Sequence, residues 1–169
     1  MLKLKPNQRV PGIVKPLSII LLAGWLGACA STDHSESPSM TPADQAQYLM
    51  QAAGQGDKNI VQQLISNGAD VNFLDASGNS PLSEAALQGK LTIVKMLIKA
   101  GSDVNITPKG ESLLMHIVRN NDLLTAQVLI AAGADVNFHT AEGVSALSIA
   151  KEKGYGELEM LLIQSGAQS

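Results

Sequence analysis

The sequence predicts an all-α solenoid of about four helix-turn-helix repeats with short hairpin loops. The first observation is self-similarity, because one motif recurs as NGADVN at 67–72, AGSDVN at 100–105 and AGADVN at 132–137. The second is a set of glycines, each placed after an apolar pattern with helical spacing and separated by 33, 32 and 33 residues: Gly68, Gly101, Gly133 and Gly166. The third is composition, since 45% hydrophobic but only 3% aromatic residues favour thin, closely stacked helices with an aliphatic core. A period of this length indicates stacked repeat units.

Residues 1–28 read as a secretory leader rather than as part of the fold. The segment has a cationic start without acidic residues, followed by an apolar stretch from Leu17 to Leu26. As a helix this stretch would be roughly 15 Å long, about half of what a bilayer core requires. It therefore predicts the apolar region of a signal peptide and not a membrane span.

Cys29 is the single cysteine of the chain, which excludes an intramolecular disulfide framework and a cysteine-based zinc cluster. The segment Leu26-Gly27-Ala28-Cys29 resembles the bacterial lipobox. That resemblance implies a thiol alkylated with diacylglycerol, cleavage before Cys29 and a lipid anchor in the membrane. The alternative is an ordinary signal peptide cut nearby, with Cys29 incidental.

The residue that follows Cys29 predicts which of the two bacterial membranes would hold the lipid anchor. In bacterial lipoproteins an Asp there marks inner-membrane retention, whereas here Ala30-Ser31 follows, which implies the outer membrane and the periplasmic side. Removing residues 1–28 leaves 8 basic against 15 acidic residues, a net charge near −7. Such a surface disfavours nucleic-acid binding, which needs a basic face for phosphate contacts.

Residues 29–40 read as a flexible tether, because ASTDHSESPSM at 30–40 is polar and lacks periodicity. The fold is expected to begin at Thr41-Pro42, an N-cap followed by a proline at the first helical position, with Asp44 three residues after the cap. The repeat domain then spans 41–169, with repeats at about 41–73, 74–105, 106–138 and 139–169.

The most complete copy, DASGNSPLSEAALQGKLTIVKMLIKAGSDVN at 75–105, resembles the ankyrin repeat, a hairpin followed by two antiparallel helices. Ser80-Pro81-Leu82-Ser83 stands where the family has Thr-Pro-Leu-His. No copy carries that His, so the hydrogen bonds that it makes between repeats are in question here. The third copy is one residue short before Gly110, which predicts a tighter hairpin tip. Glu159 stands where the earlier repeats carry apolar residues, as expected of a terminal repeat that faces water.

No catalytic or cofactor site emerges from the sequence. His34, His116 and His139 lack metal-ligand spacing. Asp70, Asp103 and Asp135 fall in the recurring G-x-D-V-N turn, where a structural role outweighs acid–base chemistry. We therefore expect no enzyme activity, no cofactor, no metal and no small-molecule substrate; turnover that depends on one of the histidines would revive the enzyme alternative.

The resemblance implies that another protein binds on the concave face, formed by the hairpin tips and the exposed side of each first helix. By position it implicates Leu74, Ala76, Ser77, Asn79, Leu87, Gln88, Lys109, Glu111, Arg119, Asn120, His139, Glu142, Val144, Glu152 and Lys153.

Two sets of apolar residues lie near this face, and each could either pack within the fold or contact a partner. Phe73, Ile106 and Phe138 recur in phase at the hairpin bases, either as packing between hairpins or as contacts for a partner. Leu74, Leu87 and Val144 are apolar where solvent exposure is expected. The predicted function is a lipid-anchored, non-catalytic protein-binding module; the alternatives are an immunity protein against a toxin of the periplasm or membrane, and a chaperone-like companion of an envelope enzyme.

Overall fold

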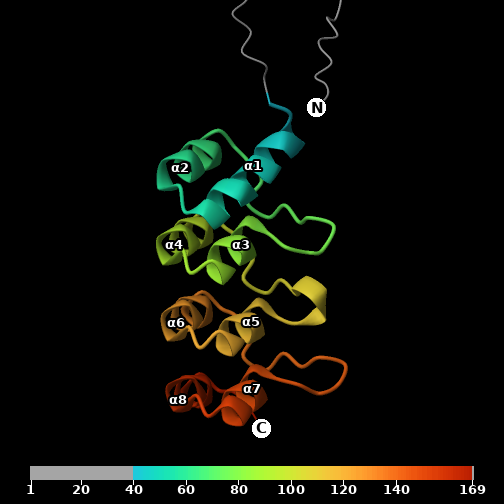
Figure 1. Cartoon of the computed structure of the whole chain (residues 1–169), viewed down its shortest axis with the longest axis vertical. Helices are drawn as coiled ribbons and strands as arrows, with labels where there is room; N and C mark the ends of the chain where they lie inside the picture. Colours follow the sequence, from blue (N-terminus) through green and yellow to red (C-terminus); the bar gives the residue numbers. More distant parts are fainter. Residues whose placement is uncertain (1–39, 169) are drawn as a thin grey trace, which may run out of the picture. The chain divides into compact units, whose positions relative to one another are not determined.

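The computed structural model describes residues 40–168, so Cys29 and most of the predicted tether lie outside the described residues. The described part is helical, and its helices form four pairs stacked one on another (Figure 1). The predicted all-α solenoid is confirmed. The pairs are α1 (Pro42–Gln55) with α2 (Lys58–Ser66), α3 (Pro81–Leu87) with α4 (Leu91–Lys99), α5 (Leu113–Arg119) with α6 (Leu123–Ala131), and α7 (Ala146–Lys153) with α8 (Gly156–Gln164).

The stack has two columns of helices. The first helices α1, α3, α5 and α7 pack on one another in sequence, and α2, α4, α6 and α8 do the same beside them (Figure 1). The hairpin loops project from the side of the first helices. Isolated helices of seven to nine residues are marginal in water, so contacts between successive pairs supply most of their stability.

Short polar side chains begin the first helix of each pair. Thr41 and Asp44 form a reciprocal capping box at α1, and Ser80 with Ser83 forms another at α3. The fourth pair repeats this box at the start of α7. In the third, Ser112 caps α5 through the Met115 backbone N–H, but methionine offers no hydroxyl for the reciprocal bond. Serine in the family's His position thus closes the cap locally.

A left-handed glycine ends the second helix of each pair, as the sequence predicts. Gly68 has a φ of 82°, donates to the Ile65 carbonyl at 3.1 Å, and the next N–H, of Ala69, reaches the Leu64 carbonyl at 3.0 Å. These two bonds make a Schellman motif, which satisfies carbonyls that the helix end leaves free. The same pair of bonds recurs at Gly101, Gly133 and Gly166.

The core is aliphatic and runs through the whole stack. Leu49, Leu82, Leu114 and Leu147, at equivalent positions of the first helices, are at most 2% exposed. The second helices contribute Val61, Val94 and Ala126, all fully buried, whereas Glu159 at the same position of α8 is partly exposed. Within residues 40–168, α8 is the last helix of the stack, and its charged residue is partly exposed there, as expected.

Asparagine side chains connect the turns that follow the second helices. Asn72 Oδ1 accepts from the Asp103 N–H at 2.8 Å, and Asn72 Nδ2 donates to the Gly101 carbonyl at 3.1 Å. Asn105 and Asn137 make the corresponding bonds one and two repeats further on. Hydrogen bonds between repeats are thus present without the family's His, and the asparagines of the recurring motif supply them.

The hairpins differ as the repeat lengths predict. The short third copy forms a 3-10 turn, η1 (Pro108–Gly110), in which Lys109 takes a left-handed φ of 56°. Phe73 is partly buried, whereas Ile106 belongs to the core and Phe138 packs against it, which favours the packing role for the latter two.

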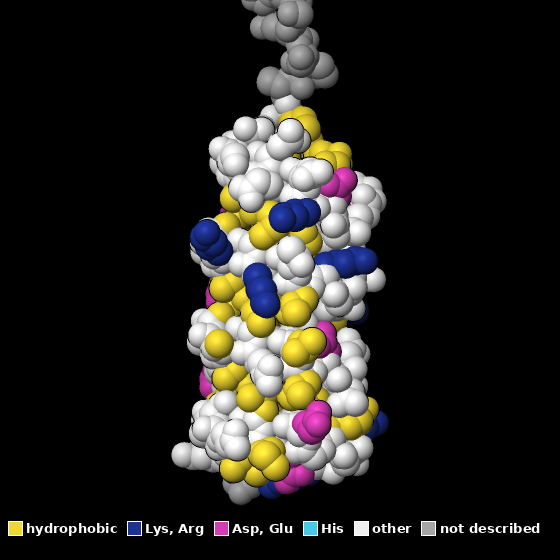
Figure 2. All heavy atoms as spheres, turned by 90° about the vertical axis from the view of Figure 1, so that its left-hand side faces the viewer, with side chains coloured by type: hydrophobic (Ala, Val, Ile, Leu, Met, Phe, Trp, Pro, Cys, Tyr) yellow, Lys and Arg dark blue, Asp and Glu magenta, His cyan; other side chains and the backbone are white. Residues whose placement is uncertain are grey.

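The side formed by the second helices carries most of its cationic side chains in its N-terminal half (Figure 2). Toward the C-terminal end it exposes apolar side chains, with Leu124 61%, Met160 62% and Ile163 52% exposed.

Candidate partner-binding site

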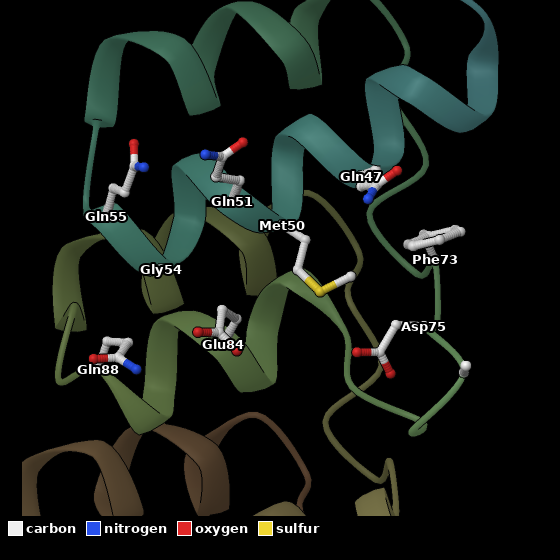
Figure 3. Close-up of a pocket in the computed structure, with 10 residues that line it drawn as sticks. Gln47, Met50, Gln51, Gly54, Gln55, Phe73, Asp75, Glu84 and Gln88 are labelled. Carbon is white, nitrogen blue, oxygen red and sulfur yellow. The ribbon is translucent and has the colours of Figure 1, made fainter.

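An open groove of about 680 Å³ lies on the predicted concave face, between α1, α3 and the first hairpin (Figure 3). We call it the α1–α3 groove. Its lining combines amide and carboxylate groups with three apolar side chains and a glycine, and it comprises Gln47, Met50, Gln51, Gly54, Gln55, Phe73, Asp75, Ala76, Glu84 and Gln88.

Helix α1 supplies one wall. Gln47, Gln51 and Gln55 are spaced four residues apart, which places them on one face of the helix. Met50 reaches from α1 into the space between the helix and the hairpin, where Phe73 and Asp75 lie (Figure 3). Helix α1 has 14 residues, against seven in α3, and its groove-lining residues lie between positions 47 and 55.

Gly54 allows α3 to lie close to α1. A Cβ atom at position 54 would lie 2.8 Å from the Glu84 Cγ and 3.1 Å from its Oε1, inside van der Waals contact. The absent side chain therefore leaves room for the half-buried Glu84 at the floor of the groove.

Asp75 organises the hairpin that forms the second wall. Its Oδ1 accepts from the backbone N–H groups of Ser77 and Asn79, both at 2.8 Å, and its Oδ2 accepts from Asn79 Nδ2 at 2.9 Å. These bonds, led by the one from the Asn79 side chain, hold the pKa of Asp75 below its ordinary value. Asp75 is therefore a carboxylate at neutral pH.

Two of the predicted partner-binding residues, Ala76 and Gln88, line the groove. Of the three apolar residues expected to be exposed, Leu74 is 50% exposed, whereas Leu87 is partly buried and Val144 packs against the core. The expected exposure of Leu87 and Val144 is therefore only partly met. Ser77 and Asn79 form the first hairpin tip. The remaining predicted residues with exposed side chains lie on the third and fourth repeats, outside this groove: Lys109, Asn120, His139, Glu142, Glu152 and Lys153.

Glu111 and Arg119 bond to each other instead of standing free. Arg119 Nη2 donates to Glu111 Oε1 at 2.7 Å and Nε donates to Oε2 at 3.2 Å, a bidentate pair. His116 lies nearby, with Nε2 3.3 Å from the Pro108 carbonyl oxygen. The pair fastens the hairpin of the third repeat to α5.

Sequence reasoning missed most of the groove. The partner-binding residues that it named start at Leu74, in the second repeat, so none of them lies on α1. The spacing of Gln47, Gln51 and Gln55 was the available signal for a polar helix face. Asp75 and Glu84 do not stand out in the sequence, because a turn aspartate and an isolated helix glutamate have ordinary structural uses.

Within residues 40–168, no cluster of His, Cys, Asp and Glu side chains has an arrangement that could hold a metal ion. In the same range, the helices are too short or too polar for a bilayer crossing.

Stacked helix pairs with projecting hairpins and an open groove lined by polar and apolar side chains define a repeat-type interaction scaffold. The family model for ankyrin repeats, in three copies, matches residues 21–108 and 49–140. The chain belongs to the ankyrin-repeat family, and its repeats form a protein–protein interaction module.

Among curated proteins, the chain is similar to the mouse B-cell lymphoma 3 protein homolog, with 43% identity over 60 residues. The match covers 36% of this chain and 13% of that protein. The similarity therefore concerns a short run of repeats and not the whole relative.

Proposed function

We propose that this chain is a non-catalytic protein-binding module, anchored by a lipid on Cys29 to the periplasmic side of a bacterial outer membrane. The observation that carries the binding role is the α1–α3 groove. Within residues 40–168, its glutamine side chains and Glu84 take no part in a side-chain hydrogen bond or ion pair. Polar groups that have no partner within the described fold are available to another protein.

The anchor is supported by the sequence before the described residues. A cationic start, an apolar stretch too short to span a bilayer and the Leu26-Gly27-Ala28-Cys29 segment agree with one another. Ala30 in place of Asp supports the outer membrane. Protein binding beside a membrane suits such an anchor, because covalent geometry allows the 13 Cα–Cα steps from Cys29 to Pro42 to span at most roughly 45 Å.

The anchor is tested by metabolic labelling of cells with an alkyne analogue of palmitate. The wild-type chain is expected to take up label and to sediment with the outer membrane, whereas Cys29→Ser is expected to do neither. Label on Cys29→Ser, or an unlabelled wild-type chain in the soluble periplasmic fraction, would refute the anchor.

The binding role is tested separately by crosslinking in intact cells, followed by mass spectrometry of the captured proteins. We expect one envelope or secreted protein to be enriched over an otherwise identical strain that lacks the chain. The identity of the captured protein decides among a general scaffold, an immunity protein that holds a toxin, and a companion of an envelope enzyme.

A further inference from the structure

We propose that the α1–α3 groove binds a short segment of the partner protein in which a Lys or Arg side chain lies next to an apolar side chain. This proposal rests on the proposed function, since it names the chemistry of the protein that the module binds. It is argued from the charge, the apolar floor and the amide groups of the groove.

The charge of the groove selects a cation. Its lining includes the carboxylates of Asp75 and Glu84 but no Lys, Arg or His side chain. Glu84 is half-buried, and within the described residues it has no ion-pair partner. A partly desolvated carboxylate gains most from a cationic group that donates hydrogen bonds to it, and Arg and Lys are the side chains that do so.

Among α3, α5 and α7, only α3 carries an acidic residue at the position of Glu84. Counted from the capping serines, Glu84 in α3 corresponds to His116 in α5 and Ile149 in α7. His116 already contacts the Pro108 carbonyl oxygen, and Ile149 is 1% exposed. The charged floor therefore does not continue along the first helices, and a partner that needs a carboxylate is directed to the first two repeats.

The floor also offers an apolar contact beside the carboxylates. Met50 and Phe73 are both partly buried, and Met50 lies between α1 and the hairpin close to Asp75 (Figure 3). Methionine adapts its shape to the side chain that it meets. An apolar residue next to the basic residue would cover this pair while the cation reaches the carboxylates.

The amides suit the main chain of the bound segment. Gln47, Gln51 and Gln55 on α1 and Gln88 on α3 face the groove from its two sides, and each amide provides both donors and acceptors. Peptide N–H and C=O groups need both kinds of partner when they leave water. The groove can therefore hold a segment of protein chain through its backbone and select it through one basic and one apolar side chain.

The first test maps the contact in intact cells with the full-length chain. The photo-crosslinking amino acid benzoylphenylalanine is placed at Gln51 in the groove or, as a matched control, at Gln127, an exposed glutamine of α6. We expect Gln51 to capture a segment with Lys or Arg next to an apolar residue, and Gln127 not to capture it. A segment captured at Gln51 that lacks a basic residue would overturn this proposal and leave the proposed function standing; capture of no protein at Gln51, at Gln127 or by general crosslinking would refute both.

The second test measures how much the negative charge of Glu84 contributes to the affinity for the captured segment. The captured segment is synthesised as a fluorescent peptide, and its affinity for the purified full-length chain is measured by anisotropy. Glu84→Gln, which keeps the shape, should weaken binding about tenfold, the loss of one charged hydrogen bond. Glu157→Gln on α8, an exposed carboxylate outside the groove, should leave binding unchanged. Exchange of the charges, with Glu84→Lys in the chain and Glu in place of the basic residue in the peptide, should restore part of the affinity. Equal affinities of wild type and Glu84→Gln, with far-UV circular dichroism confirming both folds, would overturn the proposal.

Discussion

Asn105 holds the backbone of Asp135 across a repeat boundary: Asn105 Oδ1 accepts from the Asp135 N–H at 2.8 Å, while Asn105 Nδ2 donates to the Gly133 carbonyl at 3.2 Å. One amide side chain thus satisfies a donor and an acceptor of the next turn. Asp135 Oδ1 in turn accepts from the Asn137 N–H at 2.8 Å, which positions the next asparagine in the series. The recurrence of the G-x-D-V-N motif in this chain is therefore explained by a series of hydrogen bonds that connects successive turns along one edge of the stack.

Asn105→Ala is expected to lower the free energy of unfolding by about 1–2 kcal/mol, because it removes two hydrogen bonds that each contribute roughly 0.5–1.5 kcal/mol. Urea denaturation followed by far-UV circular dichroism measures the change. Asn59→Ala in α2 is the control, since this exposed side chain should shift stability by less than about 0.5 kcal/mol. Equal effects of the two substitutions would show that these hydrogen bonds add nothing to stability.

Asn121 takes a left-handed φ of 55° in the turn between α5 and α6, where the corresponding turns of the other pairs have Gly56, Gly89 and Gly154. Asn121→Gly is therefore expected to stabilise the chain by about 0.5–1 kcal/mol, because glycine adopts this conformation without steric cost. Asn121→Ala should destabilise it by a similar amount.

Gly89→Ala provides the matched comparison. A Cβ atom at Gly89 would meet no atom within 4 Å, so any loss of stability comes from the backbone alone. We expect a decrease of about 1–2 kcal/mol in urea denaturation. A neutral Gly89→Ala would contradict the explanation given for Asn121.

The Glu111–Arg119 pair is expected to contribute less than about 1 kcal/mol, although its geometry is bidentate, because the Arg119 side chain is 40% exposed and water screens the charges. A double-mutant cycle with Glu111→Gln and Arg119→Gln measures the coupling energy. That energy should fall further in 1 M NaCl, where the screening length is only about 3 Å. A coupling energy above about 2 kcal/mol that does not change with salt concentration would contradict this expectation, because it would require an ion pair that is more rigid and better shielded from water.

The hydrogen bonds that lower the pKa of Asp75 make stability depend on pH. A carboxyl group with a lower pKa in the folded state stabilises the fold above its unfolded pKa, and this contribution is lost as pH falls through the folded value. Relative to Asp75→Asn, the wild-type chain should therefore lose stability as the pH drops below about 5. The two curves of unfolding free energy against pH should run in parallel above that value; parallel curves over the whole range would contradict the role of Asp75.

The repeats could be predicted because their causes are local. A glycine with positive φ after an apolar helix, a serine before it and a fixed step between copies are visible in the sequence. The groove could not be predicted in the same way. It depends on the approach of Gly54 to Glu84, two residues 30 positions apart in the chain. The exposure of Leu87 and Val144 could not be predicted for the same reason. It is determined by how neighbouring repeats pack, and not by the position of each residue within its own repeat.

The proposed outer-membrane location depends on the residue that follows Cys29, the proposed site of lipidation. Ala30→Asp should move most of the chain from the outer-membrane to the inner-membrane fraction of a density gradient, because an Asp directly after the cysteine is the retention mark in bacterial lipoproteins. Acylation of Cys29 should be unaffected, which separates sorting from anchoring. Thr32→Asp adds the same charge two residues further on and should leave the chain in the outer membrane. An Ala30→Asp chain that stays in the outer membrane, or a Thr32→Asp chain that moves with it, would show that the position next to Cys29 does not direct this protein.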